Sequence, residues 1–199
     1  MQERLTSEEH TMIDLIDLEK YFLSAHLFEG CTAVDFTMGN GHDTLFLTHA
    51  VGEQGRVYAF DIQPQALENT RALLEKENAP NNYELILSSH DRFEEYVEGG
   101  IDAGMFNLGF LPGGDKSITT KRETTEQAVK RAVACLKPGG GLVIAVYPGH
   151  TEGRVEGNRL EAILETYDRR FICVSKFEIV NSPTSPFFFV VEKGDHAPF

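Results

Sequence analysis

The stretch from residue 33 to residue 48 constrains the fold more than any other part of this chain. A short apolar run ends in a turn that carries Gly39 and Gly41, and the first turns of a helix follow directly. Strand, glycine turn and helix in this order begin a βαβ unit. Glycines let a ligand approach the backbone closely, and a helix N-terminus offers unpaired N–H groups. The stretch therefore predicts a nucleotide-like ligand at the carboxyl end of the first strand, although glycine turns also close ordinary strand–helix connections.

An acidic residue follows at an informative distance. Residues 56–61 predict a second strand that ends in Asp61, about 20 positions after Gly39. At this spacing an acid binds the ribose hydroxyls in dinucleotide-binding and similar folds. The alternative is an aspartate that only caps the next helix, and Pro64 favours a helix start there. We expect ribose binding.

The rest of the chain alternates strands and helices. Strands are predicted at 31–36, 56–61, 83–87, 101–107, 142–147, 171–179 and 187–192, and helices at 11–29, 44–51, 65–77, 123–136 and 159–167. This alternation predicts a parallel sheet in one α/β domain over residues 1–199, in which 1–29 form an N-terminal extension and helix. That helix either covers one face of the sheet or lines a ligand pocket. The last two strands resemble a hairpin at a sheet edge.

Three loops are expected to meet the glycine turn. Residues 108–120 follow the fourth strand and 148–156 follow the fifth, and both are long or rich in glycine. Such loops in a compact domain are usually functional. Ser89, His90 and Asp91 follow the third strand. Because parallel strands end at one edge of a sheet, all three loops reach the edge that carries the glycine turn.

Composition and charge exclude several other classes of protein. The net charge of −13 over 199 residues argues against broad, non-specific nucleic-acid binding but leaves a local basic patch open. No apolar run approaches the roughly 18 residues of a membrane span, and the N-terminus lacks the apolar core of a signal peptide. The cysteines are dispersed without a C-x-x-C pair, which argues for free thiols and against zinc: Cys31, Cys135 and Cys173. We therefore expect a cytoplasmic protein with no metal site and no membrane partner.

Two motifs resemble those of the class I S-adenosylmethionine-dependent methyltransferases. These enzymes carry Asp-x-Gly-x-Gly-x-Gly after the first strand, and here the motif reads Asp35-x-Thr37-x-Gly39-x-Gly41, with threonine for the first glycine. The run 137–140, Lys-Pro-Gly-Gly, is a further habitual feature before strand five. The resemblance implies a Rossmann-like fold, with a seven-stranded mostly parallel sheet, helices on both faces and a C-terminal antiparallel hairpin. It also implies S-adenosylmethionine as the cofactor.

Longer segments are similar, almost word for word, to one bacterial family labelled rRNA methylases. The segments are 35–44, 60–63, 89–91, 106–120 and 147–150, and the string 107–120 is the most distinctive. The resemblance covers about residues 30–193. Studied members of the family look to be tRNA 5-(aminomethyl)-2-thiouridine methyltransferases. The resemblance therefore implies methylation of the amine on the wobble uridine, with the anticodon arm of tRNA as the partner.

The resemblance also implies a set of cofactor-binding residues at the carboxyl edge of the sheet. They are Asp35, Thr37, Met38, Gly39, Asn40, Gly41, Asp43, Thr44, Asp61, Ile62, Gln63, Ser89, His90, Asp91, Asn107 and Leu108. The run 107–110 sits where amino-methyltransferases carry Asn-Pro-Pro-Tyr, in which the asparagine oxygen accepts a hydrogen bond from the target nitrogen. Asn107 is therefore the first catalytic candidate, holding the amine or the methionine moiety, and its alternative role is that of a turn residue. Phe110 and Tyr147 are expected to contact the substrate.

Proton transfer and phosphate contact are assigned to the loops. An alkylamine is mostly protonated at pH 7 and must react as the neutral amine, so Asp115 and His150 are the candidate proton acceptors. Lys116, Lys121 and Arg122 give the loop after strand four a positive charge, as a phosphate contact requires. A solvated loop explains the same charges.

Other functions stay open at this point. A methyltransferase could act on rRNA or on a small amine-containing metabolite, and a closed apolar pocket without a basic rim would favour the metabolite. A non-catalytic cofactor-binding module is a third class, against which the intact set of acids and glycines argues. The sequence leaves the oligomeric state open, a homodimer included.

Overall fold

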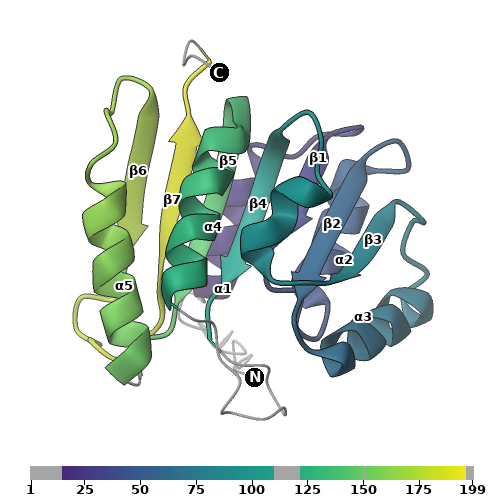
Figure 1. Cartoon of the computed structure of the whole chain (residues 1–199), viewed down its shortest axis with the longest axis horizontal. Coiled ribbons are helices and arrows are strands. Elements are labelled where there is room, and N and C mark those ends of the chain that lie inside the picture. Colours follow the sequence, from purple (N-terminus) through teal and green to yellow (C-terminus); the bar gives the residue numbers. More distant parts are fainter. Residues whose placement is uncertain (1–14, 110–121, 150, 196–199) are drawn as a thin grey trace, which may run out of the picture.

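The computed structural model describes residues 15–109, 122–149 and 151–195, and within these ranges the chain forms one sheet with helices on both faces (Figure 1). The sheet has seven strands in the order β3-β2-β1-β4-β5-β7-β6. The strands are β1 Thr32–Asp35, β2 Arg56–Asp61, β3 Tyr83–Leu87, β4 Ile101–Asn107, β5 Leu136–Val146, β6 Ile172–Phe177 and β7 Phe187–Lys193. The helices are α1 Leu15–Ser24, α2 His42–Val51, α3 Pro64–Lys76, the 3₁₀ helix η1 His90–Glu95, α4 Arg122–Cys135 and α5 Thr151–Leu164.

The strands β1 to β5 run parallel, and the last two strands break this pattern. β1 pairs with β2 and β4, β2 pairs with β3, and β4 pairs with β5. β7 pairs antiparallel with both β5 and β6, so β6 forms the edge of the sheet. The predicted fold, a mostly parallel Rossmann-like sheet with a C-terminal antiparallel pair, is confirmed. The strand order reverses between β1 and β4, and ligands bind at such switch points. We call the edge where β1 to β5 end, at the bottom of Figure 1, the carboxyl edge.

Apolar side chains fill both faces of the sheet. On one face, α1 and α2 bury residues such as Leu23 and Leu47 against β1, β4, β5 and β7. On the other face, α4, α5 and η1 cover a second cluster. In that cluster the rings of Phe36 and Phe106 stack with their centroids 4.0 Å apart, at the carboxyl ends of β1 and β4. The stacked pair fixes these two strand ends side by side, and the covering role predicted for the first helix is confirmed.

The predicted start of strand five is wrong. The sequence predicts this strand from residue 142, after a helix that ends at 136, but β5 already begins at Leu136, which pairs with Ile101 of β4. Two of its glycines are there for close packing. A Cβ atom on Gly140 would lie 2.8 Å from the backbone oxygen of Asp102, and one on Gly141 would overlap the ring of His26. This run of glycines, which in sequence is typical of a helix end, therefore lets β5 pack closely against β4 and His26.

The predicted loop at 148–156 is also shorter than expected. The helix α5 begins at Thr151, eight residues before its predicted start at 159. A Cβ atom on Gly157 of this helix would lie 2.8 Å from the ring of Phe187 and 3.0 Å from Val146. The glycine thus lets α5 approach β5 and β7 closely, in a position where glycine usually indicates a loop. The segment is mostly a packed helix.

Two further features are the state of the cysteines and the apolar character of the helices. All three cysteines are free thiols, and Cys31 is buried. Within the described ranges, no helix combines the length and the apolar character needed to cross a membrane.

Candidate functional site

The turn after β1 needs both of its glycines. Gly39 and Gly41 have φ angles of 52° and 87°, a left-handed backbone that side chains disfavour. A Cβ atom on Gly41 would also lie 2.9 Å from the Cα of Thr70 in α3. The hydroxyl of Thr70 donates a hydrogen bond to the carbonyl oxygen of Gly39 at 3.2 Å. The predicted glycine turn is thus a tight turn at the start of α2, and its backbone packs directly against α3.

Asp35 anchors this turn from inside the protein. Its carboxylate is buried and accepts hydrogen bonds from the Thr44 hydroxyl at 2.6 Å and from the Thr37 backbone N–H at 3.1 Å. Burial, and after it the nearby charge of Asp43, raise the pKa of Asp35 to about 7. Because its side chain is enclosed, Asp35 acts as an internal hydrogen-bond acceptor that holds the turn in place.

Asp61 meets the same turn from the neighbouring strand. Its carboxylate accepts hydrogen bonds from the backbone N–H groups of Gly39 at 3.1 Å and Gln63 at 2.9 Å. Burial raises the pKa of Asp61, and these two hydrogen bonds oppose the rise. Ile62 and Leu87 lie beside it with 52% and 51% of their surface exposed. A carboxylate next to two exposed apolar side chains suits a nucleoside, with hydroxyls on the acid and the base on the apolar surface. Sequence reasoning missed Leu87, which looks like any strand residue.

Asn107, at the end of β4, is held at three points. Its side-chain Nδ2 donates to Oδ2 of Asp43 at 2.8 Å, and its Oδ1 accepts from the hydroxyl of Tyr147 at 2.8 Å. Its backbone N–H donates to the hydroxyl of Thr37 at 2.6 Å. The threonine that replaces the first glycine of the motif therefore ties the turn after β1 to the end of β4. Asn107 and Tyr147, predicted from separate loops, are in direct contact.

Lys20 is a member of this group that the sequence did not reveal. It lies on α1, and its Nζ is 3.2 Å from Oδ1 of Asp43. Its side chain is 27% exposed and that of Asp43 is 14% exposed, so the pair is largely shielded from water. No spacing rule connects a lysine on the first helix with an aspartate on the second. The only hint was the alternative role of the first helix as the lining of a pocket.

The remaining predicted residues of the turn are partly structural. The side chain of Met38 is buried with Ala66 of α3, and Oδ1 of Asn40 accepts a hydrogen bond from Nδ2 of Asn69 at 2.9 Å. Leu108 is buried, and its N–H donates to the carbonyl of Ala145 at 3.0 Å. These side chains place the backbone around them, which is the part that a ligand can contact.

The segment after β3 behaves in the same way. Ser89 precedes η1, and the ring of His90 is buried edge-on against Phe106 at a centroid distance of 5.9 Å. Burial lowers the pKa of His90, which favours the neutral imidazole, and its buried Nε2 has no hydrogen-bond partner among the residues that the structure describes. The backbone oxygen of Asp91 accepts a hydrogen bond from Arg131 at 2.7 Å. The side chain of His90 thus belongs to the core under the carboxyl edge.

Several predicted residues lie outside the part of the chain that the structure describes. These are Phe110, Asp115, Lys116, Lys121 and His150, together with the side chain of Arg122, which is the first residue of α4. Their roles stay predictions.

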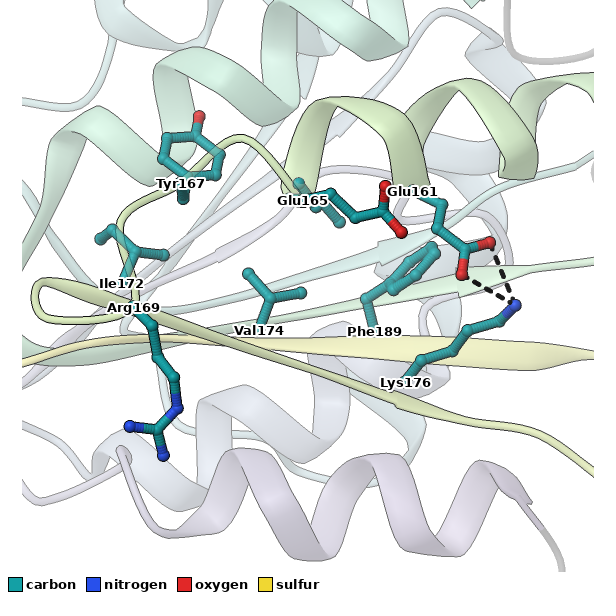
Figure 2. Close-up of a pocket in the computed structure, with 9 residues that line it drawn as sticks. Glu161, Glu165, Tyr167, Arg169, Ile172, Val174, Lys176 and Phe189 are labelled. Carbon is teal, nitrogen blue, oxygen red and sulfur yellow. Dashed lines mark hydrogen bonds and ion pairs between the residues drawn. The ribbon is translucent and has the colours of Figure 1, made fainter.

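A separate cavity of about 280 Å³ lies between α5 and the edge strand β6 (Figure 2). Val174 and Phe189 form part of its apolar wall, and Lys176 at its rim lies 3.1 Å from a carboxylate oxygen of Glu161. None of the residues predicted for the site lines it. The cavity is therefore distinct from the group at the carboxyl edge.

The sheet order, the glycine turn and the two acids define a class I methyltransferase fold. The family model described as "Putative rRNA methylase" matches residues 57–193, and the chain belongs to this family. Two solved structures are similar over 92% of this chain and 99% of their own. A "putative rRNA-methylase" from Clostridium thermocellum is 36% identical with a TM-score of 0.88. A "putative methyltransferase" from Streptococcus mutans, solved in complex with SAH, is 38% identical with a TM-score of 0.83.

A relative from a plant is similar in sequence. The chloroplastic "tRNA (mnm(5)s(2)U34)-methyltransferase" of Arabidopsis thaliana is 41% identical over 171 residues. The match takes in 79% of this chain but only 61% of the plant protein, so this chain spans less than two thirds of that relative.

Proposed function

We propose that this protein is an S-adenosylmethionine-dependent methyltransferase that methylates the amine of 5-aminomethyl-(2-thio)uridine at the wobble position of tRNA. The observation that carries the proposal is the pair of hydrogen bonds joining Asp61 and Asn107 to one turn. Asp61 accepts from the N–H of Gly39, and Asn107 donates to the hydroxyl of Thr37. A nucleoside-binding carboxylate and an amine-binding amide are thus fixed relative to each other by three residues of backbone, from Thr37 to Gly39.

The residues present fit the cofactor. Gly39 and Gly41 carry no side chain at the surface of the turn, and Asp61 has further lone pairs for two ribose hydroxyls beyond the two N–H groups that it already accepts. Ile62 and Leu87 offer an apolar surface for the base. When bound, S-adenosylmethionine supplies an electrophilic methyl group on a positively charged sulfonium. The carboxylates of this edge favour a cation.

The chain's part in methyl transfer is to orient the amine. The amide oxygen of Asn107 accepts from Tyr147 and keeps a second lone pair, and the hydroxyl oxygen of Tyr147 can also accept. A neutral amine has two N–H groups, and donating them to these two oxygens leaves its lone pair directed away from them, toward the methyl group. Positioning of this kind supplies most of the acceleration when the leaving group is good. We assign the removal of the ammonium proton to Asp115 or His150.

The choice of tRNA is supported by the plant relative, which is described as a tRNA methyltransferase and is 41% identical over the matched region. The family description names rRNA, which makes ribosomal RNA the second candidate substrate. The cluster of Lys116, Lys121 and Arg122 supports an RNA phosphate contact in either case.

The test is the transfer of labelled methyl from S-adenosylmethionine to tRNA that carries the aminomethyl precursor. Unmodified tRNA and ribosomal RNA serve as matched acceptors. We expect labelling of the precursor tRNA alone, and mass spectrometry of its nucleosides should place the methyl on the amine of the wobble uridine. Labelling of ribosomal RNA instead would select the second candidate. Labelling of neither RNA, with labelling of a small amine, would contradict both.

A further inference from the structure

Four side chains from four segments form one chain of polar contacts beside the glycine turn. Lys20 of α1 contacts Asp43 of α2 at 3.2 Å, and Asp43 accepts from the amide nitrogen of Asn107 at 2.8 Å. The amide oxygen of Asn107 accepts from the hydroxyl of Tyr147 at 2.8 Å. The two oxygens of Asp43 are thus divided between a lysine and an amide, and the two ends of the amide are divided between an acid and a hydroxyl.

We infer that Lys20 and Asp43 are positioning residues that fix which end of the Asn107 amide faces the substrate amine. The inference rests on the proposed function and deepens it. A carboxylate can only accept hydrogen bonds, so the Asn107 end that faces it must be the NH₂ group. The oxygen is then forced to the side of Tyr147, where an amine can donate to it.

The contact with Tyr147 alone would not fix the amide. A hydroxyl can donate to an amide oxygen or accept from an amide nitrogen, so it satisfies either orientation. In the flipped orientation Asn107 would present N–H donors to the N–H groups of the amine, and the amine would lose an acceptor. Asp43 removes this ambiguity because it has no proton to offer while it is ionised.

Lys20 holds Asp43 in place. Its ammonium nitrogen lies 3.2 Å from Oδ1 of Asp43, which leaves Oδ2 to the amide nitrogen of Asn107. It also counters the repulsion from the buried Asp35, with which Asp43 interacts electrostatically. The first helix therefore both covers the sheet and lines the site, so the two roles that the sequence left as alternatives hold together.

The test compares Asp43→Asn with Lys20→Met, using steady-state methylation of precursor tRNA and calorimetric titration with S-adenosylmethionine. In Asp43→Asn an amide replaces the acceptor-only group, so Asn107 can flip. We expect kcat to fall about 100-fold for Asp43→Asn and roughly tenfold for Lys20→Met. We expect KM for tRNA and the cofactor Kd to stay within about twofold, because the turn and Asp61 are untouched. Lys20→Arg should recover most of the loss, and Lys76→Met serves as a matched control on an exposed lysine paired with Glu77.

A double variant separates positioning from a general loss of structure. In an Asn107→Ala background, Asp43→Asn should slow the reaction little further, because the group that it positions is gone. Multiplying effects would overturn the inference, as would a loss of cofactor affinity as large as the loss of kcat, which would make Asp43 a cofactor ligand. If Asp43→Asn does not fold, Lys20→Met with normal kcat overturns the inference by itself. A wild-type protein that methylates no RNA overturns the proposed function, and this inference with it, and is recognised by the wild-type assay alone.

Discussion

Asp35 illustrates how a single buried carboxylate couples the site to pH. It is enclosed beneath the turn, and its pKa is raised to about 7, first by burial and then by the charge of Asp43. Hydrogen bonds from Thr44 and Thr37 oppose that rise but do not cancel it. The residue is therefore ionised in the unfolded chain over a pH range where it is protonated in the folded one.

The stability of the cofactor-free protein should reflect this difference. Between pH 5 and pH 8 the folded state binds more protons at Asp35 than the unfolded state, so stability from this group falls as pH rises, by about 3 kcal/mol. In Asp35→Asn that contribution is absent. Chemical denaturation at both pH values should show the variant gaining stability relative to wild type as pH increases. Glu84→Gln, a half-exposed acid outside the site that pairs with Arg56, is the control. An equal difference at both pH values would contradict the raised pKa.

Asp61 is the residue on which the cofactor assignment depends most. Charge-assisted hydrogen bonds to two hydroxyls are each worth roughly 1.5–3 kcal/mol, so Asp61→Ala should weaken S-adenosylmethionine binding by at least about tenfold. Because Asp61 also accepts from Gly39 and Gln63, Asp61→Asn, which keeps one acceptor oxygen, should lose less. Titration calorimetry measures both, with Glu84→Ala as a control. Unchanged affinity in Asp61→Ala would remove the ribose contact.

At the scale of elements, the glycine turn and its distal counterpart allow a matched comparison. Gly41 and Gly52 both have positive φ angles, 87° and 66°, so alanine strains the backbone at each. The added Cβ would meet the backbone of Thr70 at 2.9 Å in the first case, but the flexible side chain of Glu29 at 3.0 Å in the second. Only Gly41→Ala must therefore displace an element of the site.

We expect Gly41→Ala to lose cofactor affinity severely and Gly52→Ala to keep it, with stability reduced by about 1–3 kcal/mol in the latter. Calorimetric titration and thermal unfolding separate the two effects. Equal losses of affinity in the two variants would mean that the turn is only a structural connection.

The elements show what periodicity can predict and what it cannot. The bounds of β2, β3 and β4 match their predictions because their apolar runs end at polar or glycine residues. The glycines of β5 and α5 made the predicted bounds wrong. Gly141 and Gly157 leave room for the side chains of His26 and Phe187, which are distant in sequence. Lys20 could not be predicted as a site residue for the same reason. Its partner is set by the packing of α1 on the sheet, which no local pattern encodes.

At the scale of the whole molecule, the obstacle to RNA binding is charge. With a net charge of −13, the surface repels a polyanion at long range, so an RNA substrate needs a local concentration of cations. The segment 116–122 offers three such residues in the sequence that follows β4, the strand that ends at Asn107. Arg56, the first residue of β2, is an exposed cation as well, but it lies at the opposite edge of the sheet from the site.

Two triple variants with the same change in net charge distinguish a phosphate contact from a general electrostatic effect. In the first, Lys116, Lys121 and Arg122 become Gln. In the second, Lys76, Arg169 and Arg170 become Gln, exposed residues near the opposite edge of the sheet. If the first set contacts phosphates, its loss releases fewer counterions, and the slope of log affinity against log salt should flatten by about 2. The second set should lower affinity slightly and leave the slope unchanged.

Filter binding of precursor tRNA from low to moderate salt measures the slopes, and cofactor affinity should be the same in both variants. Equal slopes in the two variants would mean that the RNA approaches by another surface.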